Sequence, residues 1–325
     1  MNTIKRTLTS MATAVALGGM AATFAPASFA EAPMVKTQAP GFHRILLGDF
    51  EITALSDGTV KLPVTKLLHG KPEKTSAALK KNFLGDEVDT SVNAYLINTG
   101  TKLVLVDTGA AGLFGPTLGN VVSNLKAAGY KPEQVDAVVI THMHPDHVGG
   151  LMNGDQRAFP NATLHIDKND TDHWLSKANL DAAPADGKGF YQGAMVSVNP
   201  YVAAGKLVTF SGDTELVPGI KARATYGHTP GHSIFEIESK GQKMILWGDL
   251  MHVAAVQFDD PTVTIAFDSD SKSARAQREK AFAEAAKNGY LVGATHLSFP
   301  GVGRLVKKAD GKGYRFLPLN YMGLK

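Results

Sequence analysis

The sequence predicts a layered α/β sandwich that forms a single domain. Short apolar segments of strand length recur in both halves of the chain, and segments with helical periodicity flank them in each half. No long linker separates the two halves. With 325 residues, of which 44% are hydrophobic and 19% charged, the chain has the composition of a globular protein with a sizeable core.

The N-terminal segment has the pattern of a secretory signal. Lys5 and Arg6 provide a positive start, residues 11–25 are small and apolar without any charge, and small residues at 28 and 30 offer a cleavage site. The alternative is a membrane anchor, but the apolar run is short and rich in Ala and Gly. We therefore expect a signal peptide over residues 1–30 and a mature domain over residues 31–325, located in the periplasm or secreted.

Charge and cysteine content limit the partners and the kinds of metal site. The formal net charge is +3, from 33 basic and 30 acidic residues, and no block of lysine or arginine stands out. We therefore expect neither nucleic acid nor a membrane surface as a partner. The chain has no cysteine, so it forms no disulfide, and any bound metal is held by imidazole and carboxylate groups.

In the first half of the chain, turn residues separate the predicted strands. Gly48-Asp49 and the segment 99–101 predict two hairpins, and Gly129 is placed to end a helix. The expected strands are 44–47, 50–55, 92–98, 102–107 and 135–141, and the expected helix is 121–128.

The second half repeats this organisation. Lys240-Gly241 predicts a third hairpin, and Gly289 is placed to end a long amphipathic helix. The charged stretch 272–280, which includes Arg278, is interpreted as the solvated face of that helix. The expected strands are 163–166, 206–210, 220–225, 233–238, 243–247, 291–295 and 314–317, and the expected helix is 271–287.

A histidine-rich segment that follows the predicted strand 135–141 indicates a metal site. His142, His144, Asp146 and His147 place four metal-binding side chains within six residues. In extended chain, residues two apart point the same way, so His142 and His144 can face one ion together. Pro145 then ends the strand, and the next turn can present Asp146 and His147 to a second ion. Such a cluster is very rarely explained by packing alone.

Two complete coordination spheres need more ligands than this segment offers. His228, Asp249 and His296 each come just after a predicted strand. α/β folds place their sites where strands end, so we expect these three side chains to join the cluster.

These motifs together resemble the metallo-β-lactamase superfamily. They are His-x-His-x-Asp-His at 142–147, Gly-His-Thr-Pro-Gly-His at 227–232, Gly-Asp at 248–249 and the late histidine at 296. Within the superfamily, the mature chain resembles the methyl parathion hydrolase family and its lactonase relatives. Segments 46–52, 105–109, 257–260 and 296–301 carry this closer match. The resemblance implies an αββα sandwich, in which helices flank two mixed sheets, and a homodimer.

The resemblance also implies a ligand set for two divalent ions, with zinc as the best candidate. His142, His144 and His228 would bind one ion, while Asp146, His147 and His296 would bind the other. Asp249 would bridge the two ions, so Asp249 and Asp146 are the predicted catalytic carboxylates. A hydroxide bridging the ions would then attack a carbonyl carbon or a phosphorus atom.

Several other residues have expected supporting roles. By resemblance, Asp107 orients a ligand histidine, whereas a turn aspartate is the alternative. His232 is expected to be a structural, hydrogen-bonding histidine near the loop that carries His228. The residues expected to line the substrate pocket are Phe114, Trp174, Phe190, His252, Ile265 and Phe267.

The substrate is less well determined than the metal site. His252 stands where methyl parathion hydrolase has leucine, and Ile265 and Phe267 are bulkier than their counterparts there. These differences favour a planar aryl ester or a lactone such as dihydrocoumarin over an organophosphate triester. Methyl parathion hydrolysis proper, acyl-homoserine lactone hydrolysis, thioester hydrolysis and β-lactam hydrolysis are the alternative enzyme activities. A metal-storage protein is the non-enzymatic alternative.

Overall fold

The computed structural model describes residues 32–324, so the predicted signal peptide lies outside the described residues. The helices and strands all fall within one compact unit that begins at Pro40. Within the described residues, no helix combines the length and the apolar character needed to cross a membrane.

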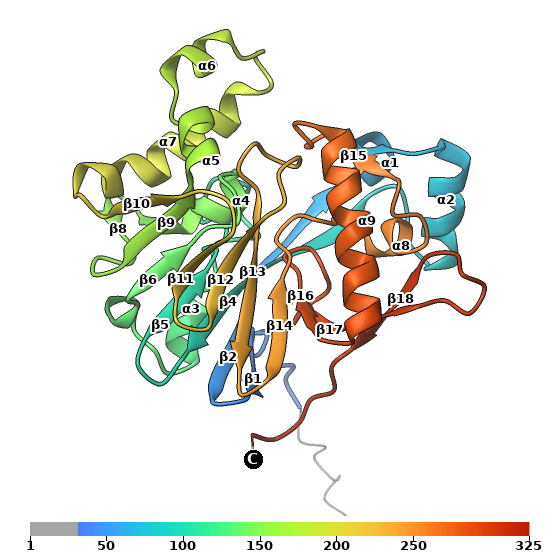
Figure 1. Cartoon of the computed structure of the whole chain (residues 1–325), viewed down its shortest axis with the longest axis horizontal. Coiled ribbons are helices and arrows are strands. Elements are labelled where there is room, and N and C mark those ends of the chain that lie inside the picture. Colours follow the sequence, from blue (N-terminus) through green and yellow to red (C-terminus); the bar gives the residue numbers. More distant parts are fainter. Residues whose placement is uncertain (1–31, 325) are drawn as a thin grey trace, which may run out of the picture. The chain divides into compact units, whose positions relative to one another are not determined.

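Two mixed seven-stranded sheets form the centre of this unit (Figure 1). The first sheet has the strand order β1 (Phe42–Leu47), β2 (Phe50–Leu62), β4 (Val88–Asn98), β5 (Leu103–Val106), β6 (Ala137–Val139), β9 (Thr163–Asp167) and β10 (Leu207–Phe210). The second has the order β11 (Thr214–Val217), β12 (Ile220–Ala224), β13 (Ser233–Ser239), β14 (Gln242–Leu246), β16 (Leu291–Gly293), β17 (Val302–Lys307) and β18 (Tyr314–Pro318). Two short pairs complete the strands: β3 (Leu68–His69) with β15 (Thr264–Ile265), and β7 (Met152–Asn153) with β8 (Gln156–Arg157).

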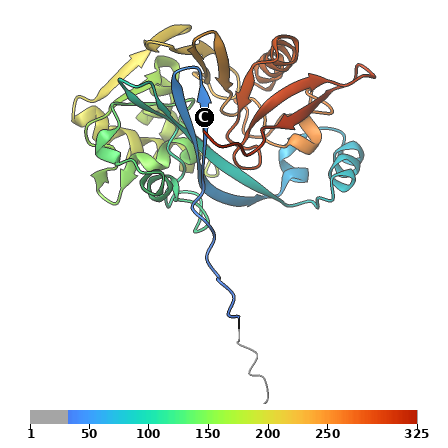
Figure 2. The ribbon, with the colours of Figure 1, turned by 90° about the horizontal axis from the view of Figure 1, so that it is seen from below.

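Helices lie beside both sheets (Figure 2). They are α1 (Val64–Leu67), α2 (Pro72–Lys81), α3 (Val121–Ala127), α4 (Pro145–Val148), α5 (Lys168–Trp174), α6 (Lys177–Ala182), α7 (Lys188–Ala203), α8 (Ala254–Gln257) and α9 (Ser271–Asn288), with 3₁₀ turns at Pro132–Gln134 and Gly149–Leu151.

The layers follow from the alternation of side chains along the strands. On β4, Tyr95 and Ile97 point into the core between the two sheets, whereas Leu96 points to the outer face, where α3 and α7 pack. On β13, Phe235 faces the same central core, and Ile234 packs with α9 on the other outer face. The result is the predicted αββα sandwich, in which central strands such as β4 and β13 are buried on both faces.

Local chemistry explains the turns and helix ends that the sequence predicts. Lys240 and Gly241 both have positive φ, 50° and 73°, which is the backbone of the two-residue turn that joins β13 to β14. The helix α9 is capped at its start by Asp270, whose carboxylate accepts from Lys272 N and Ser273 N, and at its end by Gly289 in the left-handed conformation.

The structure also contains elements that the sequence did not predict. The strand expected over 135–141 is regular only over Ala137–Val139, and β17 was not expected. The sixteen-residue helix α7 contains Pro200 and Gly193, which disfavour helix, so its formation depends on packing of its buried side chains against α4 and the first sheet.

The interpretation of the charged face of α9 was wrong at one position. Arg278 is buried, with 1% of its surface exposed, and its guanidinium donates to three main-chain carbonyls. A buried cation is tolerated here because these carbonyl oxygens replace its water.

Candidate metal centre

The seven predicted ligands lie just beyond the ends of four strands. His142 and His144 follow β6, and Asp146 and His147 lie on the short helix α4. His228 follows β12, Asp249 follows β14 and His296 follows β16. Because β14 and β16 are parallel, Asp249 and His296 emerge at the same end of the second sheet.

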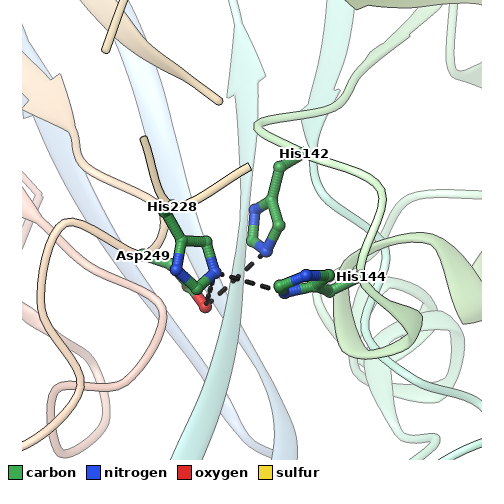
Figure 3. Close-up of side chains that lie close together, drawn as sticks. All are labelled: His142, His144, His228 and Asp249. Carbon is green, nitrogen blue, oxygen red and sulfur yellow. Dashed lines mark hydrogen bonds and ion pairs between the residues drawn. The ribbon is translucent and has the colours of Figure 1, made fainter. Parts of the chain in front are cut away.

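These side chains form two groups whose potential ligand atoms lie within 4.8 Å of one another. One group contains His142, His144, His228 and Asp249 (Figure 3), and the other contains Asp146, His147, Asp249 and His296. Asp249 belongs to both groups. Six of the seven residues are buried, and the Asp146 side chain is 14% exposed.

Hydrogen bonds at the far side of three imidazole rings determine which nitrogen faces the centre of the cluster. His147 Nδ1 donates to Asp107 Oδ2 at 2.8 Å, and His228 Nδ1 donates to Asp268 Oδ1 at 2.9 Å. His296 Nδ1 donates to the carbonyl of Ser91 at 2.9 Å. When each ring is neutral, its proton therefore lies on Nδ1 and the lone pair of Nε2 faces the centre.

These Nε2 atoms lie close to the Asp249 carboxylate, which is itself rich in lone pairs. His147 Nε2 is 3.2 Å from Oδ1, and His228 Nε2 and His296 Nε2 are 3.4 and 3.1 Å from Oδ2. Lone pairs at such distances repel unless a proton or a metal ion lies between them. His142 Nε2, His147 Nε2 and Asp249 Oδ1 are also buried without a hydrogen bond in the described part of the chain. The residues therefore fit divalent metal ions.

The Asp249 carboxylate divides the cluster into two kinds of imidazole. Burial lowers the pKa of His147, His228 and His296, but Asp249 outweighs it and raises these pKa values above the usual range, that of His228 to about 9. Burial and the neighbouring His147 hold the pKa of His142 well below its usual range, and burial and His228 do the same for the pKa of His144. Burial alone would raise the pKa of Asp249, but His296 and His147 hold that pKa well below its usual range. Neutral imidazole and ionised carboxylate are the forms that bind metal, so His142, His144 and Asp249 are ready to bind, whereas metal binding would displace a proton from His147, His228 and His296.

Asp107 occupies the position expected of a carboxylate that orients a ligand. Besides His147, it accepts from the N–H and the hydroxyl of Thr141, each at 2.8 Å. Its φ of 58° is unusual for a residue other than glycine, and such strain is retained mainly where the surroundings impose it.

His232 lies beside the cluster and supports the main chain of Asp249. His232 Nε2 accepts from Asp249 N at 3.1 Å, so its proton lies on Nδ1, which is 2.8 Å from Thr225 Oγ1. Burial is the main cause that lowers the pKa of His232 to about 3, which keeps the ring neutral and able to accept.

The residues predicted for the substrate pocket divide into two sets. Trp174 and Phe190 lie against His144, with ring centroids 5.3 and 4.9 Å away, and Phe267 lies 6.3 Å from Phe190. In contrast, Phe114 and the fully buried Ile265 pack in the hydrophobic cluster around Val64 and Leu79. Ile265 therefore exposes no surface to a substrate, although Phe267 packs on the same cluster.

His252 belongs with the first set. Its Nε2 lies 3.0 Å from Asp249 Oδ2, and its ring stacks on His296 at 5.0 Å and lies 6.1 Å from Phe267. Neither ring nitrogen makes a hydrogen bond within residues 32–324. His252 thus contributes an additional imidazole beside both ligand groups.

Comparison with known families decides the classification. The sequence profile of the metallo-β-lactamase superfamily matches residues 88–296, which include all seven candidate ligands. The chain belongs to this superfamily. It is a metal-dependent hydrolase of the metallo-β-lactamase fold, as the sequence predicts.

Several characterised members of the superfamily are similar to this hydrolase. An N-acyl homoserine lactonase from Bacillus sp. is 27% identical over 215 residues, which cover 60% of this chain and 78% of that protein. The crystal structure of AbOPH, a hydrolase in the beta-lactamase superfamily, is 39% identical with a TM-score of 0.83, and the match covers 88% of this chain and 100% of that one. AidC, a dizinc quorum-quenching lactonase solved with a product, N-hexanoyl-L-homoserine, is 28% identical with a TM-score of 0.78 and covers 87% of this chain and 99% of that one.

Sequence reasoning did not find two carboxylates that support the centre. Asp268 orients His228. Asp170 accepts from the main chain of segments 142–147 and 227–232, which carry His142, His144 and His228. Neither aspartate belongs to a recognisable motif, and each lies at least 27 residues from the residues of the ligand segments that it contacts. Only the folded chain brings them to the site.

Proposed function

We propose that this hydrolase holds two divalent ions, zinc being the best candidate, and cleaves lactones and aryl esters. The observation that carries the proposal is the sharing of Asp249 by the two ligand groups. A carboxylate common to two groups is suited to hold two ions about 3.5–4 Å apart. Imidazole and carboxylate ligands without thiolate suit zinc.

Bound ions of this kind would lower the pKa of a water molecule toward neutrality and supply positive charge to the oxygen of the scissile group. The protein provides the geometry for this chemistry. Asp107 and Asp268 hold His147 and His228 with their Nε2 atoms turned to the centre, and His232 holds the main chain of Asp249.

Lactones are supported as the substrate class by the relatives and by the surroundings of His144. The Bacillus protein and AidC are both named as lactonases. Trp174 and Phe190 place aromatic surface against His144, and Phe267 extends it toward His252. An apolar surface beside the ligands suits the acyl chain of a lactone or the ring of an aryl ester.

The test is a comparison of four substrates with zinc-loaded protein: dihydrocoumarin, an acyl-homoserine lactone, a p-nitrophenyl ester and methyl parathion. We expect a lactone or the aryl ester to be turned over fastest. His144→Ala and EDTA treatment should abolish activity, whereas His165→Ala, which changes a histidine outside both ligand groups, should not. Absence of activity on all four compounds would contradict the proposed substrate class.

Phosphotriester hydrolysis is the second candidate activity, based on the resemblance of the chain to methyl parathion hydrolase. We expect it as a side activity, because His252 and Phe267 place bulky rings beside the centre and reduce the space for a phosphotriester. If methyl parathion were the best of the four substrates, these residues would not determine the preference of the enzyme.

We also propose that the mature enzyme is exported after cleavage near Ala30 and forms a homodimer. The N-terminal sequence of protein recovered from the periplasm tests the first point. Light scattering of the purified protein tests the second, and a monomer mass would contradict it.

A further inference from the structure

We propose that Asp170 is a positioning residue. It sets the distance between the two chain segments that carry the ligands His142, His144 and His228, which we call the three-histidine group, and thereby the metal affinity of this group. The first segment, 142–147, carries His142 and His144. The second, 227–232, carries His228. The inference rests on the metal centre proposed above and adds a residue that belongs to neither ligand group.

The carboxylate of Asp170 joins the main chains of these segments directly. Its Oδ2 accepts from Met143 N at 2.8 Å, and its Oδ1 accepts from Gly231 N at 2.6 Å. Met143 lies between His142 and His144, and Gly231 lies three residues after His228. One side chain therefore contacts the segments that deliver all three imidazoles.

The packing around Asp170 leaves little room for another arrangement. Asp170 is fully buried, and a Cβ atom at Gly231 would lie 2.5 Å from Asp170 N and 2.9 Å from Asp170 Oδ1. Glycine at 231 is thus required for the close approach of the two main chains. The contact therefore depends both on the carboxylate of Asp170 and on the absence of a side chain at Gly231.

A main-chain hydrogen bond also joins the two segments, at a different point from Asp170. Ser233 N donates to the carbonyl of Thr141 at 2.9 Å, which joins the two segments where they leave their strands. Asp170 joins them further along, at Met143 and Gly231. Two links determine the relative orientation of the segments, whereas one would act as a pivot.

Asp170 also couples the metal centre to the aromatic surface. It lies on α5, one helical turn before Trp174, whose ring contacts His144. The same helix therefore fixes the ligand segments through Asp170 and covers a ligand through Trp174.

The experiment measures zinc affinity separately for each ligand group. His296→Ala leaves the three-histidine group as the intact site, and His144→Ala leaves the group of Asp146, His147, Asp249 and His296. Zinc dissociation constants are measured by competition with a chelator, with and without Asp170→Asn. Asparagine keeps the shape of the side chain but opposes one main-chain N–H with an N–H₂ group.

We expect Asp170→Asn to weaken zinc binding about 10- to 100-fold in the His296→Ala background, the usual size for residues that orient ligands, and to leave the His144→Ala background unchanged. Gly231→Ala, which displaces Asp170 without removing its charge, should act in the same selective way. Equal losses in both backgrounds, or no loss in either, would overturn the proposal.

A matched control separates this role from general stability. Asp57 is also fully buried and accepts from two main-chain N–H groups, those of Ala110 and Val121, but it contacts neither ligand segment. Asp57→Asn should lower stability without selective loss of zinc. If the wild-type protein bound no zinc, the metal centre itself would be wrong. If it bound zinc and Asp170→Asn retained full affinity, only the role of Asp170 would be wrong.

Discussion

Arg278 donates a hydrogen bond through Nη1 to the main-chain carbonyl of Leu250, the residue that follows Asp249, at 3.1 Å. Its other guanidinium nitrogens donate to the carbonyls of Pro261 and Val263. Gln257 joins the same network: its Nε2 donates to Val263 O, and its Oε1 accepts from His252 N. A buried cation on α9 thus holds the loop that carries Asp249 and His252.

Replacing Arg278 with methionine should destabilise the protein by about 2–4 kcal/mol, because it leaves buried carbonyls without donors. Arg275→Met provides the control, since Arg275 is exposed on the same helix and pairs with Glu279; its loss should cost less than about 0.5 kcal/mol. Urea unfolding of both variants measures the difference. Equal stabilities would mean that the buried network contributes nothing.

Asp268→Asn should weaken zinc binding by the three-histidine group about 10- to 100-fold, because His228 loses the carboxylate that orients its ring. Asp270→Asn serves as the control. Asp270 caps α9, asparagine caps helices equally well, and its side-chain bonds go to Lys272 and Ser273. Chelator competition with both variants is the measurement, and a similar loss from each would argue against a specific role for Asp268.

Metal removal should destabilise the protein, because the ions bind the folded state. Without the ions, the buried imidazoles lie directly against the Asp249 carboxylate with no metal charge between them. With free zinc at 1,000 times its dissociation constant, the stabilisation is about 4 kcal/mol. We expect EDTA to lower the thermal midpoint and added zinc to restore it. An unchanged midpoint in EDTA would indicate that no stabilising ion was bound.

The ion pair between Arg223 and Glu284 predicts a pH dependence of stability. The hydrogen bond from Arg223 lowers the pKa of Glu284 below its usual value of 4.5. A carboxyl group whose pKa is lowered in the folded state stabilises it above the unfolded pKa and loses this contribution as the pH falls through the folded pKa. Glu284→Gln should therefore cost about 0.5–1 kcal/mol at pH 7, as expected for a partly exposed pair, and less at pH 2–3.

Urea unfolding of wild type and Glu284→Gln at both pH values checks this sign. The reverse pattern, in which the two proteins differ more in acid, would show that the pair does not stabilise the fold.

Phe190→Ala should impair long-chain lactones more than short-chain ones. Phe190 lies 4.9 Å from His144 and 6.3 Å from Phe267, so its removal opens the aromatic surface beside the ligands. Losing part of an apolar contact costs about 1–3 kcal/mol of binding, or about a tenfold to hundredfold rise in KM for a long acyl chain. Phe83→Ala, at a side chain that is 99% exposed, should leave every KM unchanged.

Several features of the fold are predictable because their causes are local. The hairpin at Lys240-Gly241 requires two residues with positive φ, and the alternation of strands such as β4 follows from one chain segment facing two layers. In contrast, α7 contains Pro200 and Gly193, and only its packing against α4 and the first sheet makes it a helix. Local propensity is weak where tertiary contacts oppose it.

The candidate metal centre could be predicted from the sequence, because His142, His144, Asp146 and His147 are neighbours in the chain and the other candidate ligands follow predicted strands. How these side chains are held could not be predicted, because their supporting contacts come from distant parts of the chain. Asp268 reaches His228 across 40 residues, Asp170 reaches Met143 across 27, and Arg278 finds its carbonyl acceptors in the loops before α9. Such contacts depend on burial and direction, which no local pattern encodes, because a buried carboxylate or guanidinium looks the same in sequence as a solvated one.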